Sequence, residues 1–388
     1  MVMQSNRFSR LAGVELIGPE GLDRLQASKV AVVGVGNLGG EVARHLAQMG
    51  ISQRLVDRDV VKTENLGTQG FTEDDIGLSK VAGRARFLSK LNSSCGIEIV
   101  DADLRDLGMG ALHDVDLIFS CLDSRPIRAH LSEIATRLAV PWVDAGLDGS
   151  GKTLVGRVAC YDPRRSDSPC YLCSHDQNSL REMMREGVEG CPRFQPGPAR
   201  PAGPPTIAIS ALGSAVAATQ VVWGLQLLLG RAEEVVGKEV HLDLQRGLMA
   251  SHVVHRNRAC LLEHRRFNLS TITGGRALRV AETFSLAEQK LGPGVKLNLH
   301  HRSIATGLRC ETCKRQKLVF RVRESLTESD IRCECGEALQ PLASDLLDRF
   351  RKADAQAFGD RTWEQLGLPA NDVVSASKGR KTLDLLLS

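Results

Sequence analysis

The chain has 388 residues, enough for two or three domains and a substantial core. Hydrophobic residues make up 42% and charged residues 25%, a balance that excludes disorder over most of the length. A net charge of +4 and an aromatic content of 4% give no support to a nucleic-acid or membrane partner.

The N-terminal segment MVMQSNRFSRLAG has no apolar run that could form the core of a signal peptide, so we expect a cytoplasmic protein. In a reducing compartment, its eleven cysteines are expected to bind metal or to react rather than to form disulfides. The uncharged segment 206–230 is long enough to cross a bilayer, but its Ser, Thr and Gln side chains favour a buried helix.

Apolar runs alternate with amphipathic segments between residues 29 and 146. We expect strands at 29–34, 54–57, 97–100, 115–121 and 142–145, and helices at 38–49, 81–91 and 127–138. This alternation predicts an α/β fold with a Rossmann-like, mostly parallel sheet that helices cover on both faces. Strands at 153–161, 239–244 and 250–254 are expected to extend the sheet in an antiparallel direction.

The sequence divides into a first domain, residues 1–267, and a C-terminal region, residues 268–388, with a small cysteine-rich module at 310–335. Six prolines and three glycines between 190 and 205 predict that the crossover segment 176–205 is a mobile loop. We expect the tail, 371–388, to be ordered only at its final residues, LDLLLS.

A glycine-rich turn joins the first expected strand to the following helix. It contains Gly34, Gly36 and Gly39 in the pattern GxGxxG, and acidic residues Asp57 and Asp59 end the next strand. Glycines let the backbone approach a phosphate, the helix N-terminus offers unpaired N–H groups, and an acid about twenty residues further on can bind ribose hydroxyls. These residues alone suit a dinucleotide and ATP equally.

Polar residues downstream separate the two ligands. They are Asn65, Gln69, Lys80, Asp123 and Arg128. Hydride transfer needs no such set, whereas cleavage of ATP between its α and β phosphates needs cations and a carboxylate that can hold Mg²⁺. The sequence therefore favours ATP.

Together with Arg7-Phe8-Ser9-Arg10, these motifs resemble those of the ubiquitin-activating and MoeB/ThiF-like adenylyltransferases over about residues 6 to 265. The resemblance implies that residues 1–267 form an ATP-dependent adenylation domain that binds ATP and Mg²⁺. It further implies that Arg10 reaches the site of the partner subunit in a homodimer. The implied nucleotide-binding residues are Gly34, Gly36, Asn37, Gly39, Asp57, Asp59, Asn65, Gln69, Lys80, Asp123 and Arg128.

The chain departs from the family pattern at two positions of this site. Thr68 stands where the family usually has an arginine, and Asn37 replaces a glycine that is common in the turn. Loss of one phosphate contact at Thr68 could lower activity, unless another cation such as Arg10 supplies it.

Two groups of cysteines have the spacing of zinc ligands. Cys170 and Cys173 form a CxxC knuckle, and Cys260 with His264 follows the last expected strand, where the family carries a second CxxC. The second group comprises Cys310, Cys313, Cys333 and Cys335. This group lies outside the resemblance and is expected to form a zinc-ribbon docking module.

Cys191 lies at the position where activating enzymes of this family carry a reactive cysteine. We expect an enzyme that adenylates the C-terminal glycine of a ubiquitin-like protein, then transfers it to Cys191 as a thioester for a conjugating enzyme. Arg10, Lys80 and Asp123 complete the expected catalytic set. The alternatives are a sulfur-carrier adenylyltransferase of the MoeB/ThiF type, an NAD-dependent oxidoreductase and a scaffold without activity.

Overall fold

The computed structural model describes residues 7–148, 150–189 and 209–388. The chain divides into two compact units. Among the described residues, the first extends to Arg266, apart from the short segment Asp106–Ala111 and residues 188 and 189, which belong with the second unit. The second unit otherwise begins at Phe267.

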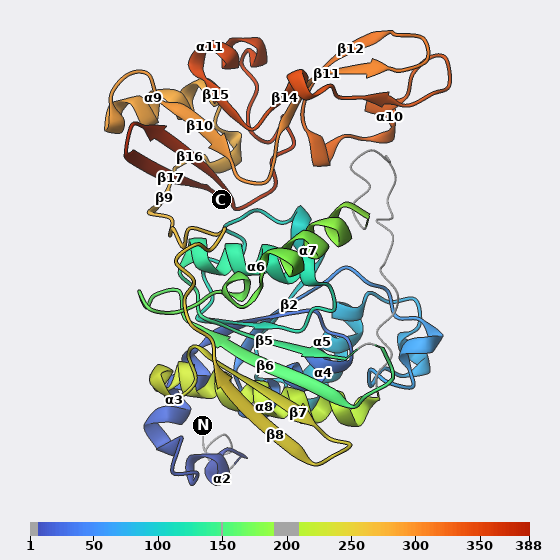
Figure 1. Cartoon of the computed structure of the whole chain (residues 1–388), viewed down its shortest axis with the longest axis vertical. Coiled ribbons are helices and arrows are strands. Elements are labelled where there is room, and N and C mark those ends of the chain that lie inside the picture. Colours follow the sequence, from blue (N-terminus) through green and yellow to red (C-terminus); the bar gives the residue numbers. More distant parts are fainter. Residues whose placement is uncertain (1–6, 149, 190–208) are drawn as a thin grey trace. The chain divides into compact units, whose positions relative to one another are not determined.

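The first unit is built around an eight-stranded sheet in the order β3-β2-β1-β4-β5-β6-β7-β8 (Figure 1). Its strands are β1 (Lys29–Val33), β2 (Ser52–Asp57), β3 (Ile97–Asp101), β4 (Leu117–Ser120), β5 (Trp142–Leu147), β6 (Val155–Tyr161), β7 (Lys238–Asp243) and β8 (Leu248–Val253). Its helices are α2 (Ser9–Ala12), α3 (Gly18–Ala27), α4 (Asn37–Met49), α5 (Lys80–Leu91), α6 (Arg125–Leu138), α7 (Gln177–Glu189) and α8 (Ser210–Leu228).

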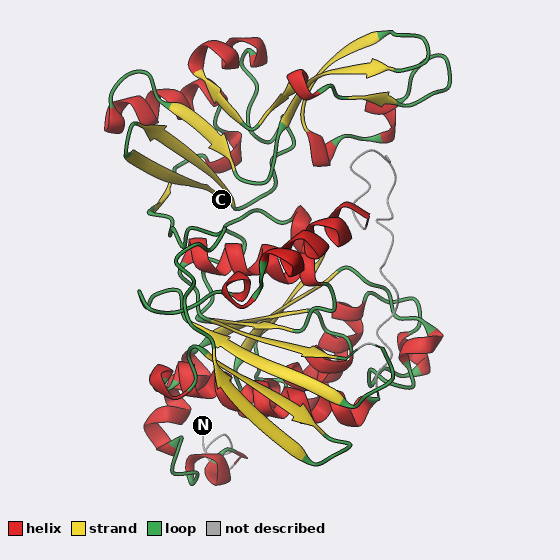
Figure 2. Cartoon of the chain, in the orientation of Figure 1, coloured by secondary structure: helices red, strands yellow, loops and turns green. Residues whose placement is uncertain are grey.

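The pairing of the strands confirms the expected Rossmann-like sheet with an antiparallel extension. The five neighbouring strands β3, β2, β1, β4 and β5 pair in parallel. The pairs β5–β6, β6–β7 and β7–β8 are antiparallel. All four residues of β4 are buried, as expected for a parallel strand that is covered on both faces. Helices lie on both faces of the sheet (Figure 2).

Helix α8 packs against α4 and against strands β5 and β6. It is the one helix of the described residues that is long and apolar enough to span a membrane, and 56% of its apolar window is buried inside the protein. Its Gln220 is fully buried and donates from Nε2 to Ser120 O at 2.9 Å and to Val143 O at 2.8 Å. A polar side chain that joins two neighbouring strands is characteristic of a core helix, as the sequence predicts.

The first half of the expected crossover loop forms helix α7. Leu180 and Met183 are three residues apart, the spacing of one helical face, and Met183 is 5% exposed. The polar residues around this short apolar pattern conceal it in the sequence. Residues 190–205 lie outside the described residues.

The second unit contains a five-stranded sheet and a smaller four-stranded sheet. Its strands are β9 (Leu269–Thr271), β10 (Lys296–Leu299), β11 (Ile304–Cys310), β12 (Gln316–Val322), β13 (Leu339–Gln340), β14 (Leu346–Leu347), β15 (Arg349–Arg351), β16 (Asp372–Lys378) and β17 (Lys381–Leu387). Its helices are α9 (Val280–Leu291), α10 (Glu328–Ile331) and α11 (Lys352–Ala355). Aromatic residues including Phe284, Phe350 and Trp363 fill its main core.

A buried ion pair fixes the segment 106–111 in the second unit. Arg302 donates from Nε to Asp372 Oδ2 at 2.8 Å, and its Nη2 donates to Leu107 O at 2.7 Å. Asp372 also accepts a hydrogen bond from Met109 N at 2.9 Å. The connection between β3 and β4 therefore contributes to the second unit, which the sequence pattern did not indicate.

The C-terminal tail is ordered over a longer segment than we expect from the sequence. Strands β16 and β17 form an antiparallel hairpin from Asp372 to Leu387, and its turn contains Gly379 at φ +58°. The lysines and arginine around this turn suggest a solvated tail. In the two strands that the turn joins, however, alternate residues are buried in the main core of the second unit.

Candidate nucleotide-binding site

The glycine-rich turn lies at the point where the order of the parallel strands reverses. On one side β1 pairs with β2, the next strand in the chain, and on the other side it pairs with β4. Ligands of open α/β sheets bind in the crevice at such a point, beyond the carboxyl ends of the strands. The turn follows β1, and Asp123 follows β4, so the fold brings these two predicted features to neighbouring strand ends.

Close backbone contacts explain two of the glycines. Gly34 has φ +86°, and a Cβ there would lie 2.7 Å from Cys121 O. A Cβ on Gly39 would lie 1.8 Å from Gly34 O. Gly36 caps α4 without a side-chain hydrogen bond, which leaves the first N–H groups of this thirteen-residue helix available to an anion.

Asp57 holds the turn from the end of β2. Its Oδ2 accepts from Val35 N at 2.8 Å and its Oδ1 accepts from Asp59 N at 2.9 Å. Burial raises the pKa of this carboxyl, while the two amides and the nearby Lys80 act in the opposite direction. Both oxygens already have backbone partners, so in this structure Asp57 shapes the turn, and its contact with a nucleotide stays a prediction.

Lys80 and Asp59 form an ion pair beside the turn. Lys80 Nζ lies 3.0 Å from Asp59 Oδ2, and the Lys80 side chain is 9% exposed against 53% for Asp59. Lys80 N also donates to Asp59 O at 2.8 Å. The cation is therefore held in place by a carboxylate that itself remains accessible to a ligand.

The loop that carries Asn65 and Gln69 lies against the turn. Asn65 Oδ1 accepts from Lys62 N at 2.9 Å, which leaves its amide N–H₂ as the group that could meet a ligand. A Cβ on Gly36 would lie 3.3 Å from Gln69 Oε1, and this oxygen is buried without a hydrogen-bond partner. Asn37 occupies the first turn of α4, where its Nδ2 donates to Ile209 O at 3.2 Å.

Arg128 supports the strand end that precedes Asp123. Its guanidinium donates to Leu122 O from Nε at 2.9 Å and also from Nη2, and Nε lies 3.7 Å from Asp144 Oδ1. Arg128 is 8% exposed, whereas Asp123 is exposed. The structure thus gives Arg128 a supporting position and leaves the Asp123 carboxylate open to solvent.

Arg10, another catalytic candidate, is not brought to this turn. Arg10 is exposed on α2 and lines a groove with Met49, at the C-terminal end of α4, and with Val221 of α8. The glycine-rich turn lies at the other end of α4. Cys191 lies outside the described residues.

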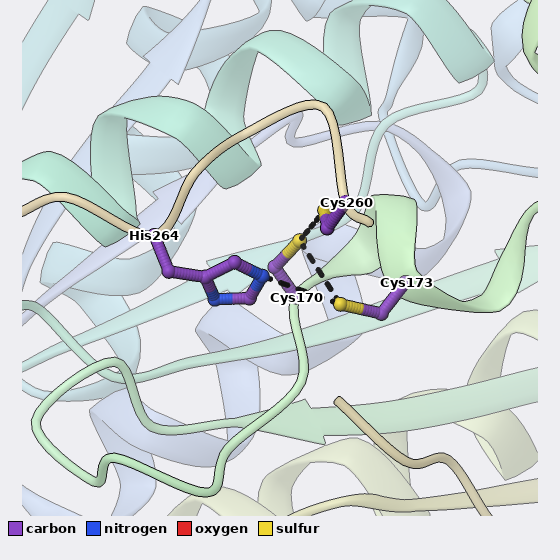
Figure 3. A group of neighbouring side chains, drawn as sticks. All are labelled: Cys170, Cys173, Cys260 and His264. Carbon is purple, nitrogen blue, oxygen red and sulfur yellow. Dashed lines mark hydrogen bonds between the residues drawn. The ribbon is translucent and has the colours of Figure 1, made fainter. Parts of the chain in front are cut away.

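The first cysteine group converges as its spacing predicts (Figure 3). Cys170 Sγ lies 3.7 Å from Cys173 Sγ and 3.5 Å from Cys260 Sγ, and Cys173 Sγ lies 3.3 Å from His264 Nε2. A tetrahedral Zn²⁺ site with Zn–S bonds of about 2.3 Å has sulfur atoms about 3.8 Å apart. The four side chains fit such an ion.

The second cysteine group lies in the small sheet of the second unit. Cys333 Sγ lies 3.4 Å from both Cys313 Sγ and Cys335 Sγ, and Cys310 Sγ lies 3.5 Å from Cys335 Sγ. Cys310 ends β11, and Cys333 follows α10. The four thiols again fit a tetrahedral ion.

A third group of metal-binding side chain types was not predicted. Glu239 Oε1 lies 2.9 Å from His241 Nε2 and 3.9 Å from His252 Nε2, on adjacent strands β7 and β8. Arg157 Nη1 contacts the other carboxylate oxygen at 2.9 Å. Glu239 and His241 lie two positions apart on β7, but His252 joins them only through the pairing of β7 with β8, which the sequence does not display.

Residues 8–262 match the model of the ThiF family. This chain belongs to the ThiF family. The match covers the whole eight-stranded sheet, the glycine-rich turn and the three cysteines of the first cysteine group. The family suggested by the sequence motifs is therefore confirmed.

Curated relatives of this ThiF-family chain include activating enzymes. It is 32% identical over 179 residues to the SAMP-activating enzyme E1 of Haloferax volcanii, which covers 44% of this chain and 62% of the relative. It is 30% identical over 207 residues to ubiquitin-like modifier-activating enzyme 5 of Aedes aegypti, covering 48% of this chain and 51% of the relative. The chain thus matches only about half to three fifths of the length of these relatives.

Solved structures of similar fold include the E. coli protein MccB determined with ATP. That structure has a TM-score of 0.52 and 20% sequence identity, and the match covers 66% of this chain and 73% of the other. At this identity the likeness shows the fold alone.

Proposed function

We propose that this protein uses MgATP to adenylate the C-terminal carboxylate of a small ubiquitin-like protein, with release of pyrophosphate. A sulfur-carrier protein is the alternative substrate. Membership of the ThiF family and the similarity to two activating enzymes support this proposal.

The observation that carries the proposal is the position of Lys80 and Asp123 around the turn. Lys80 is held by Asp59 at the end of β2, and Asp123 follows β4 on the other side of β1. An anion at the N-terminus of α4 would therefore have a cation on one side and an exposed carboxylate on the other. Transfer of the AMP group from ATP needs the cation to stabilise the charge that develops on the phosphates, and it needs the carboxylate to hold Mg²⁺.

The proposed reaction forms one bond and breaks one. A carboxylate oxygen of the carrier protein attacks the α-phosphorus of ATP, and the bond to the β-phosphate oxygen breaks. That oxygen leaves with its electron pair as part of pyrophosphate. The N–H groups of α4 and Lys80 stabilise the charge on the phosphates, and Asp123 and Asp59 are the carboxylates that could hold Mg²⁺.

Cys191 is proposed to accept the activated group as a thioester. Its thiolate would attack the acyl carbon of the adenylate, and AMP would leave. The carrier would then pass to a conjugating enzyme, for which the cysteine-rich module 310–335 is the proposed docking site. A homodimer, in which Arg10 serves the partner subunit, and a cytoplasmic location complete the proposal.

Both cysteine groups are proposed to hold Zn²⁺ as structural sites. The donor sets, Cys₃His and Cys₄, are those of structural zinc, and neither set leaves a free ligand position for catalysis. The first ion would tie the segment after β6 to the segment after β8. The second would stabilise the small sheet of the second unit.

Exchange of labelled pyrophosphate into ATP tests the adenylation step. Exchange should require a carrier protein that ends in glycine and should fall by at least about a hundredfold in Asp123→Asn, because the Mg²⁺ ligand is lost. The exposed lysine variant Lys62→Met is the matched control and should retain exchange. Saturable NAD binding without ATP binding would overturn the proposal.

A non-reducing gel tests the thioester step separately. Protein, MgATP and carrier should give a thiol-sensitive band that is lost in Cys191→Ala and retained in Cys160→Ala. Cys160 is fully buried in β6, so its thiol is inaccessible to a carrier. Pyrophosphate exchange without this band would support the sulfur-carrier alternative and would remove Cys191 from the mechanism.

A further inference from the structure

Arg84 lies one helical turn after Lys80 on α5 and is buried beneath the glycine-rich turn. Arg84 is only 3% exposed to solvent. Nη2 donates to Gln69 O at 2.6 Å and lies 3.5 Å from Val35 O. One guanidinium thus contacts the backbone of both the glycine-rich turn and the loop that follows Asn65.

The structure leaves space for this guanidinium at Gly40. A Cβ on Gly40 would lie 2.3 Å from Arg84 Nη2. Gly40 sits in the second turn of α4, where glycine costs the helix about 1 kcal/mol relative to alanine. The guanidinium also packs over the Phe71 ring, with Cζ 4.5 Å from the ring centroid.

The charge of Arg84 has no direct counter-ion in the described part of the chain. Carboxylates of the described residues act on it only through longer-range charge interactions, and its Nε is buried without a hydrogen-bond partner. Burial lowers the pKa of this guanidinium to about 10, while the more distant Glu41, Asp75 and Asp57 act in the opposite direction. An unpaired buried cation is unfavourable, so its presence under an anion-binding turn needs an explanation.

We propose that Arg84 is a positioning residue for the triphosphate, holding the glycine-rich turn against the 65–69 loop and supplying positive charge from beneath. This inference rests on the proposed function. The phosphates lie on the ligand side of the turn, and Arg84 stabilises their charge through the turn without touching them. A bound triphosphate in turn compensates the buried cation, which couples nucleotide binding to the order of this loop.

If Arg84 served only to pack against its neighbours, its guanidinium would not be needed. Filling the space beside Phe71 requires only an apolar side chain of similar length, which methionine supplies. The guanidinium adds two properties, the contacts with two backbone oxygens and the positive charge. The charge should matter more for ATP than for AMP, because AMP lacks the β and γ phosphates.

Calorimetric titration of the full chain with ATP and with AMP tests the proposal. Arg84→Met should weaken ATP binding by at least about tenfold, in keeping with the loss of charged hydrogen bonds, and AMP binding by less than about threefold. Arg84→Lys keeps the charge and should recover part of the ATP affinity. Arg86→Met is the matched control, because Arg86 lies on the same helix and pairs with Asp75 at 2.7 Å.

Gly40→Ala provides a second test that leaves Arg84 in place. Its Cβ displaces the guanidinium, so it should weaken ATP binding in the same direction. In the Arg84→Met background it should cost little more, because the group it displaces is absent. This non-additivity holds even if the single Arg84→Met variant folds less stably.

The outcomes separate this inference from the proposed function. Wild-type protein that fails to bind ATP overturns both. Wild-type protein that binds ATP, with Arg84→Met and Gly40→Ala within about twofold of its affinity, overturns the role of Arg84 alone. Equal losses of ATP and AMP affinity in Arg84→Met, without recovery in Arg84→Lys, also overturn it and leave Arg84 as a packing residue.

Discussion

Lys80 Nζ lies 3.0 Å from Asp59 Oδ2, and the amide of the same lysine donates to the carbonyl oxygen of the same aspartate at 2.8 Å. Two contacts between one pair of residues tie the start of α5 to the end of β2. Because the Lys80 side chain is only 9% exposed, its ammonium is already positioned before a nucleotide binds. Groups that are positioned in advance stabilise a transition state without reorganisation.

Replacing this cation should affect the chemical step more than the fold. We expect Lys80→Met to reduce carrier-dependent pyrophosphate exchange by about a hundredfold, because a pre-positioned charge near the phosphates is lost. Its melting temperature should stay within a few degrees of wild type, since the ion pair is half exposed at Asp59. A Lys80→Met variant that melts well below wild type but retains its pyrophosphate exchange would contradict this assignment.

Arg128 should contribute mainly by supporting the end of β4. Arg128→Met removes both hydrogen bonds to Leu122 O and should lower the free energy of unfolding by about 2 kcal/mol. The ATP affinity should fall as well, because the strand end before Asp123 is less firmly held. Denaturant unfolding and nucleotide titration measure the two effects.

The control for Arg128 is on the same helix. Arg137 pairs with Glu133 at 3.2 Å one turn away, a contact worth about 0.5 kcal/mol. Arg137→Met should destabilise the protein less than Arg128→Met and bind ATP normally, because Arg137 lies in the last turn of α6 and Arg128 in the first. Equal destabilisation by both variants would show that Arg128 has no special role at the site.

The two cysteine groups should bind metal independently. Elemental analysis should give two Zn²⁺ per chain, and Cys173→Ser and Cys313→Ser should each remove one. Loss of the first ion should destabilise the first unit, because Cys170 contacts Cys260 across 90 residues of sequence. Cys95→Ser is the control, since that buried thiol lies outside both groups. A full complement of zinc in Cys173→Ser would rule out the first site.

How much the sequence predicts depends on how local the signal is. The glycine-rich turn, Lys80 and the CxxC knuckle are short-range patterns. The structure places the turn between β1 and α4, Lys80 beside Asp59, and the knuckle beside Cys260 and His264. Arg84 is different, because its environment depends on Gly40, which is 44 positions away in the chain. Only its spacing of four residues from Lys80 could have drawn attention to it.

Other features depend on contacts that no single segment displays. The hairpin of β16 and β17 is stable because its alternate residues pack into a core that other elements supply. Its charged turn alone would indicate a solvated tail. The interaction of Met109 with Asp372 joins residues 263 positions apart. Strand pairing likewise brings Glu239 and His252 together.

An ion network at the amino ends of the strands should make stability depend on acid pH. Burial alone would raise the pKa of Asp114, but hydrogen bonds from Arg54 and Lys29 hold it well below its usual range. A lowered folded-state pKa gives stability that is present above the unfolded value, about 3.9, and is lost as the pH falls below it.

The variant Asp114→Asn tests this dependence. At pH 7 it should melt below wild type, and the difference should shrink as the pH falls from 4 toward 2. The control Asp23→Asn should show no such trend, because Asp23 is exposed on α3 and forms none of the ion pairs found among the described residues. A difference in melting temperature that is constant with pH would contradict the assignment.

The most direct measurement is a crystal structure of the protein with a non-hydrolysable ATP analogue and Mg²⁺. We predict the triphosphate at the N-terminus of α4, with Lys80 contacting a phosphate oxygen and Asp123 directed toward the metal. A nucleotide bound elsewhere, or a nicotinamide cofactor along the same crevice with Lys80 and Asp123 turned away, would contradict the proposed adenylation.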